Sequence, residues 1–196
     1  MSVTDNIVEL MPRNREVVRR LLQHAALDLY QKQGYEQTTT AEIAAQAGVT
    51  ERTFFRHFPD KREVLFGSEA QLIELLTNEI KNAPRELGPW DTLLCALMTA
   101  EPLFIENQSS FEPLRRIIAS SPALQERHLA KVRVMTLALA AALVERGVAD
   151  RQASLTAQMG MTAIGHAVAA WHEYGSGMPN DHLKQVFDDM RALFVP

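Results

Sequence analysis

The stretch that decides the fold reads TTTAEIAAQAGVTERTFFRHFPDK, from Thr38 to Lys61. Thr39 and Glu42 have the spacing of a capping box, and the small and apolar residues that follow recur at the period of a short helix. Gly48 stands where the chain must reverse, since a residue without Cβ enters the left-handed region at little cost. Thr50 can accept a backbone N–H as the cap of a second helix, so the stretch predicts a helix-turn-helix.

The second helix has one inward face and several outward ones. Phe54 and Phe58 lie four residues apart, so both point toward the same core. The residues on its other faces are Glu51, Arg52, Thr53, Phe55, Arg56 and His57. A helix with these outward side chains is suited to reading the DNA major groove.

A third helix is predicted ahead of the motif, over residues 13–33. Its main apolar row consists of Val17, Leu21, Ala25 and Leu29. Gly34 follows as a C-cap, and the helix would complete a three-helix DNA-binding domain over residues 13–66. Residues 1–12 have no sustained periodicity and end in Pro12, which predicts a flexible N-terminal arm.

The motif is similar to that of a known family. Its characteristic residues are Gly34, Tyr35, Thr38, Thr39, Ile43, Ala44, Ala47, Gly48, Val49, Thr50, Thr53, Phe54, Phe55, Arg56, His57, Phe58, Lys61 and Leu65. In identity and spacing they resemble the DNA-binding domain of the tetracycline-repressor (TetR) family of bacterial transcription regulators. The rest of the chain is similar to the family only in length and helical character. The resemblance implies a homodimer that binds double-stranded DNA and responds to a small-molecule effector.

The resemblance also implies which residues contact the DNA backbone. They are Thr39, Thr50, Phe55, His57 and Lys61. Thr38 is a further candidate because hydroxyl groups at helix N-termini bind phosphates, although all three threonines could simply be helix caps. The family most often has tyrosine at the position of Phe55, and a phenylalanine cannot donate to phosphate. Arg56 replaces a second aromatic residue and could supply a charge-assisted hydrogen bond instead.

Base recognition is predicted for the first turn of the second helix. Arg52 can bond guanine through two N–H groups, and the methyl group of Thr53 can contact thymine. Glu51 could accept a hydrogen bond from cytosine, or it could be only a favourable charge at a helix N-terminus.

The charge distribution is compatible with DNA binding but does not by itself predict it. The net charge is −4, and residues 1–66 carry nine Lys or Arg and nine Asp or Glu, so the acidic excess lies in residues 67–196. Basic residues gather at the start of the domain and around its second helix. Phosphate attraction requires such a basic face rather than a basic protein.

Several classes of protein are disfavoured by what the sequence lacks. No apolar run approaches the ~20 residues of a membrane helix, and the N-terminus has no signal-peptide pattern, so we expect a cytoplasmic protein. Cys95 is the only cysteine and cannot form an internal disulfide. The chain has no Gly-rich phosphate loop, His-Glu-x-x-His, paired Cys or Glu-x-x-His, so we expect neither an enzyme nor a bound metal or cofactor.

The rest of the chain predicts helices only, so the fold class is all-α. Lys61 to Ala83 is expected as a long helix that joins the DNA-binding domain to a C-terminal domain over residues 67–196. Further helices are expected at 90–106, with a bend at Pro102, and at 111–119, 122–146, 151–174 and 181–194.

The last two helices are the expected dimer interface. One helix-turn-helix reads one half-site, so specific binding usually needs two copies one helical turn of DNA apart. The resemblance implies that the helices at 151–174 and 181–194 form a four-helix bundle across a two-fold axis. An apolar face of the last helix, which could equally pack on its own chain, consists of Leu183, Val186, Phe187 and Met190.

A ligand site is expected between the helices of the C-terminal domain. The soft or aromatic residues that could line it are Met98, Phe104, Phe111, Met135, Met159 and Trp171. Arg116 and His128 could orient a polar or anionic end of the ligand. Each could instead be an ordinary core or surface residue, and the sequence does not identify the effector.

These observations predict a homodimeric transcription regulator. It would be a repressor that an effector releases from a pseudo-palindromic operator by shifting the population of two dimer states, with the long helix from Lys61 as the lever. An activator or a corepressed regulator differs only in the sign of the coupling and stays open. Another alternative is a helical ligand-binding or interaction protein without specific DNA binding.

Overall fold

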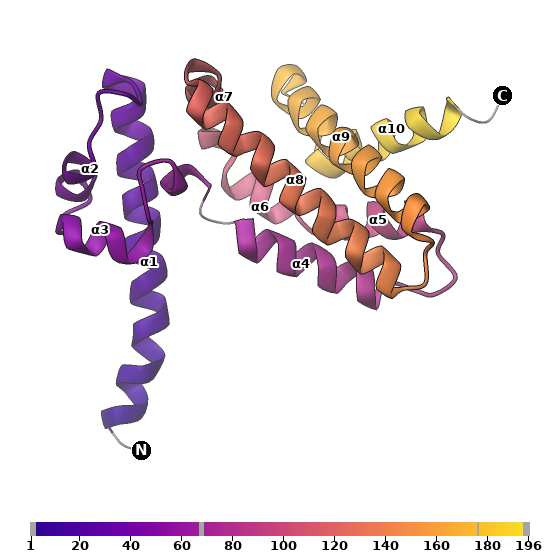
Figure 1. The fold of residues 1–196 in the computed structure, drawn as a ribbon, viewed down its shortest axis with the longest axis horizontal. Helices are drawn as coiled ribbons and strands as arrows, with labels where there is room; N and C mark the ends of the chain where they lie inside the picture. Colours follow the sequence, from indigo (N-terminus) through magenta and orange to yellow (C-terminus); the bar gives the residue numbers. More distant parts are fainter. Residues whose placement is uncertain (1–2, 67–68, 176, 194–196) are drawn as a thin grey trace. The chain divides into compact units, whose positions relative to one another are not determined.

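A computed structural model describes residues 3–66, 69–175 and 177–193, with side chains from Arg15 onward (Figure 1). Its helices in chain order are α1 (Val3–Gln33), α2 (Thr40–Gln46), α3 (Glu51–His57), the 3-10 helix η1 (Glu63–Leu65), α4 (Glu69–Asn82), α5 (Pro89–Met98), α6 (Glu101–Glu106), α7 (Gln108–Ser120), α8 (Pro122–Glu145), α9 (Asp150–Tyr174) and α10 (Pro179–Ala192). No strand occurs within the described ranges, which confirms the all-α prediction.

Packing divides the chain into two units. Unit 1 comprises Met1–Gly67 and Pro113–His128, and unit 2 comprises Ser68–Glu112 and Leu129–Pro196. The helix-turn-helix therefore lies in unit 1, while α7 and α8 each contribute residues to both units.

The core of unit 1 lies beneath the helix-turn-helix. Phe54 and Phe58 of α3 and Ile43 of α2 are at most 1% exposed, as their spacing predicted. Leu22 and Tyr30 of α1 belong to the same cluster, so α1 is the third wall of the domain. Each buried side chain of this size contributes about 1.5–3 kcal/mol. This packing determines which face of α3 points outward.

Unit 2 is built around α9, which packs against α5 and α10. The contact with α5 is close because Gly160 has no side chain, and a Cβ there would overlap Leu93 of α5. Phe187 of α10 is fully buried and stacks on Trp90 of α5, with ring centroids 4.1 Å apart. These contacts make α5, α9 and α10 one packed layer around a shared core.

The predicted connecting helix from Lys61 is wrong at its beginning. Lys61 lies in a turn, only a short 3-10 helix follows, and α4 begins at Glu69. The cause is Asp60, whose carboxylate accepts from the backbone N–H groups of Arg62 (2.8 Å) and Glu63 (3.1 Å) and so closes a tight turn. α4 belongs to unit 2 alone, so it is not a lever shared by both units.

Two other helix boundaries differ from the prediction. α1 begins at Val3 and includes most of the predicted arm, because Pro12 removes only one N–H donor and a helix can continue past it. The helix expected at 90–106 is interrupted between α5 and α6. There the hydroxyl of Thr99 donates to the carbonyl of Ala96 (2.7 Å), a local bond that competes with regular helix.

Candidate nucleic-acid interface

Side-chain caps fix the start of both helices of the helix-turn-helix. Thr39 Oγ1 accepts from the N–H of Glu42 (3.2 Å), and the Glu42 carboxylate accepts from the N–H of Thr39 (2.8 Å), which is the predicted capping box. The bond from the Thr39 N–H first, and then those from the Thr39 hydroxyl and from Gln33 to the same carboxylate, lower the pKa of Glu42. Gly48 takes a φ of +71° in the turn, and Thr50 Oγ1 caps α3 by accepting from the N–H of Thr53 (3.2 Å).

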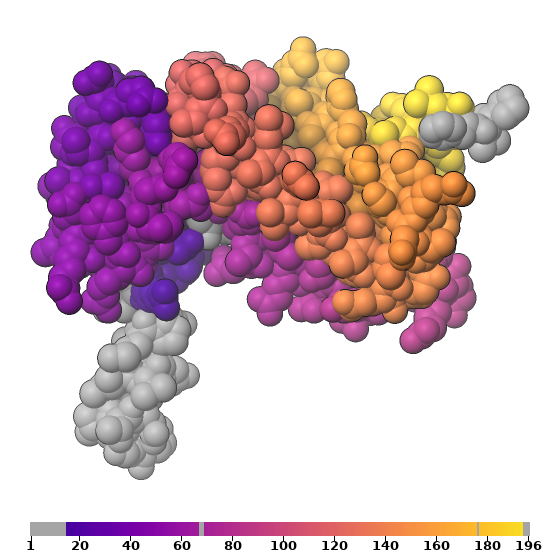
Figure 2. Space-filling model, in the orientation of Figure 1, coloured from indigo at the N-terminus to yellow at the C-terminus, as the bar shows by residue number. Residues whose placement is uncertain are grey.

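α3 directs a row of exposed side chains away from the core of unit 1. Arg52 and Arg56 are exposed, and Phe55 keeps 53% of its surface accessible although Phe54 beside it is fully buried. In the space-filling view, residues of α2 and α3 lie on the surface of unit 1 (Figure 2). The exposed ring of Phe55 offers apolar surface that a sugar-phosphate chain could cover.

Glu51 is oriented from the neighbouring helix. The hydroxyl of Thr40 at the start of α2 donates to Glu51 Oε1 at the start of α3. The carboxylate is exposed and lies in the first turn of α3, where a helix N-terminus favours negative charge. Both interpretations of Glu51, a base contact or a helix-terminus charge, are compatible with this position.

Arginines of α1 extend the basic face beyond α3. Arg19 donates to the carbonyl of His57 (3.3 Å), and its guanidinium lies 4.5 Å from the ring centroid of Phe58. Burial first, and then the charges of Arg15, Arg19 and Arg56, lower the pKa of His57, which favours the neutral form of its ring. Sequence reasoning noted the arginines of α1 but could not place them here, because they approach α3 only through tertiary packing.

Thr38 is turned inward, so its side chain does not lie on the exposed surface of α2 and α3. The residue is 1% exposed, and its hydroxyl donates to the carbonyl of Gly34 (2.8 Å). The physical reason is that Thr38 closes the turn that follows α1, whereas Thr39 is the residue that caps α2.

Lys61 is also committed to contacts within unit 1. Its ammonium group donates to the carbonyls of Tyr35 (2.8 Å), Glu36 (3.2 Å) and Thr38 (3.0 Å), and it lies 4.4 Å from the ring centroid of Tyr35. An ammonium has three N–H donors, so these carbonyls use all of them. In the absence of DNA, Lys61 therefore joins the loop before α2 to the turn after α3, and its contact with phosphate stays a prediction.

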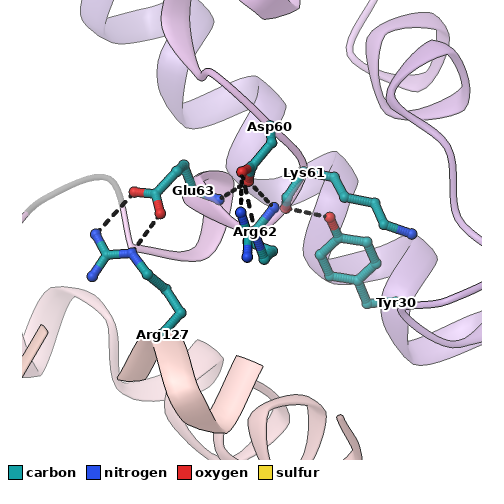
Figure 3. A network of polar contacts seen from close by, with 6 residues as sticks. All are labelled: Tyr30, Asp60, Lys61, Arg62, Glu63 and Arg127. Carbon is teal, nitrogen blue, oxygen red and sulfur yellow. Dashed lines mark hydrogen bonds and ion pairs between the residues drawn. The ribbon is translucent and has the colours of Figure 1, made fainter. Parts of the chain in front are cut away.

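The backbone at Lys61 is held as well (Figure 3). The hydroxyl of Tyr30 donates to the carbonyl of Lys61 (2.6 Å), and burial of the ring raises the pKa of Tyr30, which keeps this donor protonated. Burial alone would raise the pKa of Asp60, but hydrogen bonds from Arg62 and from the N–H of Glu63 lower it overall. The turn after α3 is thus stabilised both by the bond from Tyr30 and by the bonds to the Asp60 carboxylate.

The apolar face of α10 packs on its own chain, which is one of the two predicted alternatives for it, and a dimer contact through the other faces of α10 stays a prediction. Leu183 and Phe187 are 3% and 0% exposed within one protomer. α9 instead has an outward face whose exposed residues alternate in spacings of four and three, namely Arg151, Leu155, Gln158, Thr162, Gly165 and Ala169. Leu155 is 55% exposed, and a Cβ at Gly165 would meet no atom within 4 Å. This spacing is that of a helix-packing seam.

The predicted ligand residues divide between the two units. In unit 2, Met98, Phe104 and Met135 pack in or against the core, and Met159 is half-buried on α9. Arg116 and His128 are exposed and belong to unit 1.

Two of the predicted ligand residues meet at one histidine of unit 2. Phe111 stacks on His172, with centroids 4.1 Å apart and planes 5° apart, and Trp171 lies 4.7 Å from the same ring. A surface hollow of about 290 Å³ in unit 2 is lined by Lys81, Arg85, Glu145 and Arg146, none of which was predicted. The ligand role of all eight residues stays a prediction.

Among the described residues, no helix is long and apolar enough to cross a membrane. In the same part of the chain, no group of three or more His, Cys, Asp or Glu side chains is placed to hold a metal ion.

Comparison with known proteins places this helix-turn-helix in a family. Residues 22–67 match the family described as bacterial regulatory proteins, tetR family. The HTH-type transcriptional regulator TcmR of Streptomyces glaucescens is 46% identical over 61 residues, which are 31% of this chain and 27% of TcmR. The nucleoid occlusion factor SlmA of Photobacterium profundum is 40% identical over 72 residues, which are 36% of this chain and 35% of SlmA. The chain thus spans about a third of the length of these curated relatives or less.

The fold extends the likeness over most of the chain. The solved structure of a SmeT–triclosan complex superposes with a TM-score of 0.61 at 19% identity, covering 88% of each chain. Residues 22–67 thus match the DNA-binding domain of the TetR family of bacterial regulatory proteins. The fold of the chain, an N-terminal helix-turn-helix followed by a C-terminal helical unit, is similar to that of the SmeT structure.

Proposed function

We propose that the chain is a sequence-specific DNA-binding transcription regulator of the bacterial cytoplasm, a homodimeric repressor released from a pseudo-palindromic operator by a small-molecule effector. One observation carries this proposal: a capped α3, anchored by the buried Phe54, presents exposed Arg52 and Arg56 away from the core. Such a rigid helix with outward arginines is suited to the major groove. The proposed role requires no catalytic step.

The contacts divide into base and backbone contacts. Arg52 and Thr53, in the first turn of α3, read base edges. The residues that contact the sugar-phosphate chains are Thr39, Thr50, Phe55, Arg56 and His57, with Arg15 and Arg19 adding positive charge at the edge. Lys61 and Thr38 support this surface from within.

The dimer forms through the outward face of α9. Two copies of the seam around Leu155 and Gly165 pack across a two-fold axis, and small residues permit close approach. α10 contributes to this interface through faces other than the one that buries Phe187 within the protomer.

The effector binds in unit 2. SmeT, whose fold is similar, was solved as a complex with the small molecule triclosan. The ring cluster of Phe111, Trp171 and His172 is the side-chain group to which an apolar or aromatic effector would bind here.

Selection of binding sites from a random duplex pool, followed by titration of the winning site, tests the proposal. We expect a two-fold symmetric site bound far more tightly than random DNA. Arg52→Ala should weaken binding to the selected site by about 5–150-fold, or ~1–3 kcal/mol, with little change on random DNA. Arg85→Ala, which removes an exposed arginine of unit 2, is the matched control. Equal losses on both DNAs would contradict base reading by Arg52.

Sedimentation tests the interface. Leu155→Glu places a charge on the proposed seam and should yield folded monomers, while Leu103→Glu, at another exposed leucine of unit 2, should leave the dimer intact. If the Leu155→Glu protein sediments as a dimer, the interface lies on another surface.

A further inference from the structure

Part of the DNA-binding unit lies far from it in the sequence. The end of α7 and the start of α8, Pro113–His128, belong to unit 1, and we name this segment the α7–α8 corner. Ile117 and Leu124, which are 5% and 0% exposed, belong to the same core cluster as Phe54 of α3. The corner is therefore an integral part of the packing beneath the helix-turn-helix.

A bidentate ion pair attaches the corner to the turn after α3 (Figure 3). Arg127 donates from Nε to Glu63 Oε1 and from Nη2 to Glu63 Oε2 (2.9 Å), and both side chains are less than a quarter exposed. The guanidinium also lies 5.2 Å from the ring centroid of Phe66, which is itself buried. Two parallel charge-assisted bonds, shielded from water, fix direction as well as distance.

A second contact attaches the corner to the loop before α2. Ser121 is 2% exposed, and its hydroxyl donates to Glu36 Oε1 (3.2 Å). Lys61 links the two attachment regions, because its ammonium binds the carbonyl of Glu36 while its own backbone lies two residues before Glu63. The corner thus contacts the segments at both ends of the helix-turn-helix.

The two helices that form the corner also supply the interior of unit 2. On α7, Phe111 stacks on His172, and on α8, Met135 and Leu139 are buried in the unit 2 core. A helix is a stiff element whose residues move together. Met135 and Arg127 lie on the same helix, eight residues or about 12 Å apart.

We propose that the α7–α8 corner regulates DNA binding, with Arg127 as a positioning residue that holds α3 in its DNA-competent orientation through Glu63. This inference rests on the proposed function and names the regulation of that same surface. An effector that repacks α7 or α8 in unit 2 changes operator affinity by weakening this ion pair. Because α4 is confined to unit 2, the corner takes the place of the lever that the sequence had suggested.

The first experiment measures the affinity of the full chain for the site selected by the wild-type protein. Arg127→Met should lower operator affinity by about tenfold, with the affinity for random duplex changed by about twofold at most, because only the orientation of α3 is disturbed. Arg191→Met, which removes the arginine of the exposed Arg191–Asp91 pair in unit 2, should leave both affinities unchanged. Arg127→Lys, which retains the charge without the bidentate geometry, should fall between wild type and Arg127→Met.

The second experiment tests whether a change at Met135 in the core of unit 2 alters the contribution of Arg127 to operator affinity. Met135→Ala perturbs the unit 2 core on α8, and we expect its effect on operator affinity to depend on whether Arg127 is present. Residues more than 7–10 Å apart with no shared mechanism act additively, so a departure from additivity of about threefold or more supports the coupling. Leu183→Ala on α10 is the matched core truncation and should combine additively with Arg127→Met.

The outcomes separate this inference from the proposed function. A wild-type protein that selects no site refutes the proposed function itself. A wild-type protein that selects a site, with unchanged affinity in Arg127→Met or strict additivity with Met135→Ala, overturns the inference alone. If Arg127→Met does not fold, Arg127→Lys and the charge-swapped double variant Glu63→Arg, Arg127→Glu decide. Wild-type operator affinity in Arg127→Lys, or no recovery in a folded double variant, also overturns it.

Discussion

Replacing Lys61 by methionine tests whether this lysine supports the domain or contacts DNA. Methionine keeps an unbranched side chain and removes the ammonium group. The variant loses the hydrogen bonds to the carbonyls of Tyr35 (2.8 Å), Glu36 (3.2 Å) and Thr38 (3.0 Å), together with the contact with the Tyr35 ring (4.4 Å). The bonds to Tyr35 and Thr38 are partly buried, whereas the bond to Glu36 is exposed and can be replaced by water.

The expected loss of unfolding free energy follows from these contacts. Each partly buried bond contributes about 0.5–1.5 kcal/mol, and the cation–π contact about 0.5–1 kcal/mol. With the exposed bond neglected, the loss is about 1.5–4 kcal/mol. In a chain of 196 residues this lowers Tm by about 3–16 °C.

Thermal unfolding measures this shift beside Lys184→Met, a matched change at an exposed lysine of α10 that should cost ~0.5 kcal/mol at most. DNA affinity measured between ~50 and ~200 mM salt provides the second readout. We expect the salt slope of wild type, because Lys61 neutralises no phosphate. An unchanged Tm with a slope shallower by about one unit would refute the assignment and restore the phosphate contact.

Three further predictions follow from the packing and the charges. Gly160→Ala should destabilise the protein by about 1–3 kcal/mol in denaturant unfolding, because its Cβ would overlap Leu93; an unchanged midpoint would contradict the close α5–α9 contact. Phe187→Asp should abolish cooperative unfolding by circular dichroism, and a folded monomer in sedimentation would show instead that the residue lies in the dimer interface. The pKa of His57 is lowered in the free protein, and a nearby phosphate should raise it in the DNA complex, so binding takes up a proton at pH values between the two. DNA affinity, measured by fluorescence anisotropy, should therefore increase as the pH falls through this range, and His57→Gln should remove the dependence.

The helix-turn-helix could be predicted in detail because its determinants are local. The capping pair Thr39 and Glu42, the turn at Gly48 and the buried phenylalanines of α3 all lie within one short stretch, and each signal acts over four residues or fewer. Sequence spacing alone therefore separates the inward face of α3 from the outward one.

The surroundings of residues whose partners are distant could not be predicted. Lys61 was expected to contact phosphate because it follows the reading helix, but its partners lie 23 to 26 residues earlier in the chain. A sequence does not distinguish an exposed lysine from a lysine that binds three carbonyls, because the adjacent residues can be the same in both cases. The same holds for Arg127, whose carboxylate partner is 64 residues away.

Amphipathic faces have the same ambiguity for a different reason. Phe187 and Leu155 both lie on helices with helical apolar spacing, yet one is fully buried in its own protomer and the other is 55% exposed. Apolar spacing shows that a face will be covered, but the covering surface is chosen by the whole fold. Ile117 and Leu124 illustrate this most clearly. They lie on α7 and α8, which contribute residues to both units, and they are buried in the core of unit 1. In the sequence, Ile117 and Leu124 cannot be distinguished from ordinary core residues. A role of these residues in regulation can therefore be found by double-mutant coupling, but not by a sequence motif.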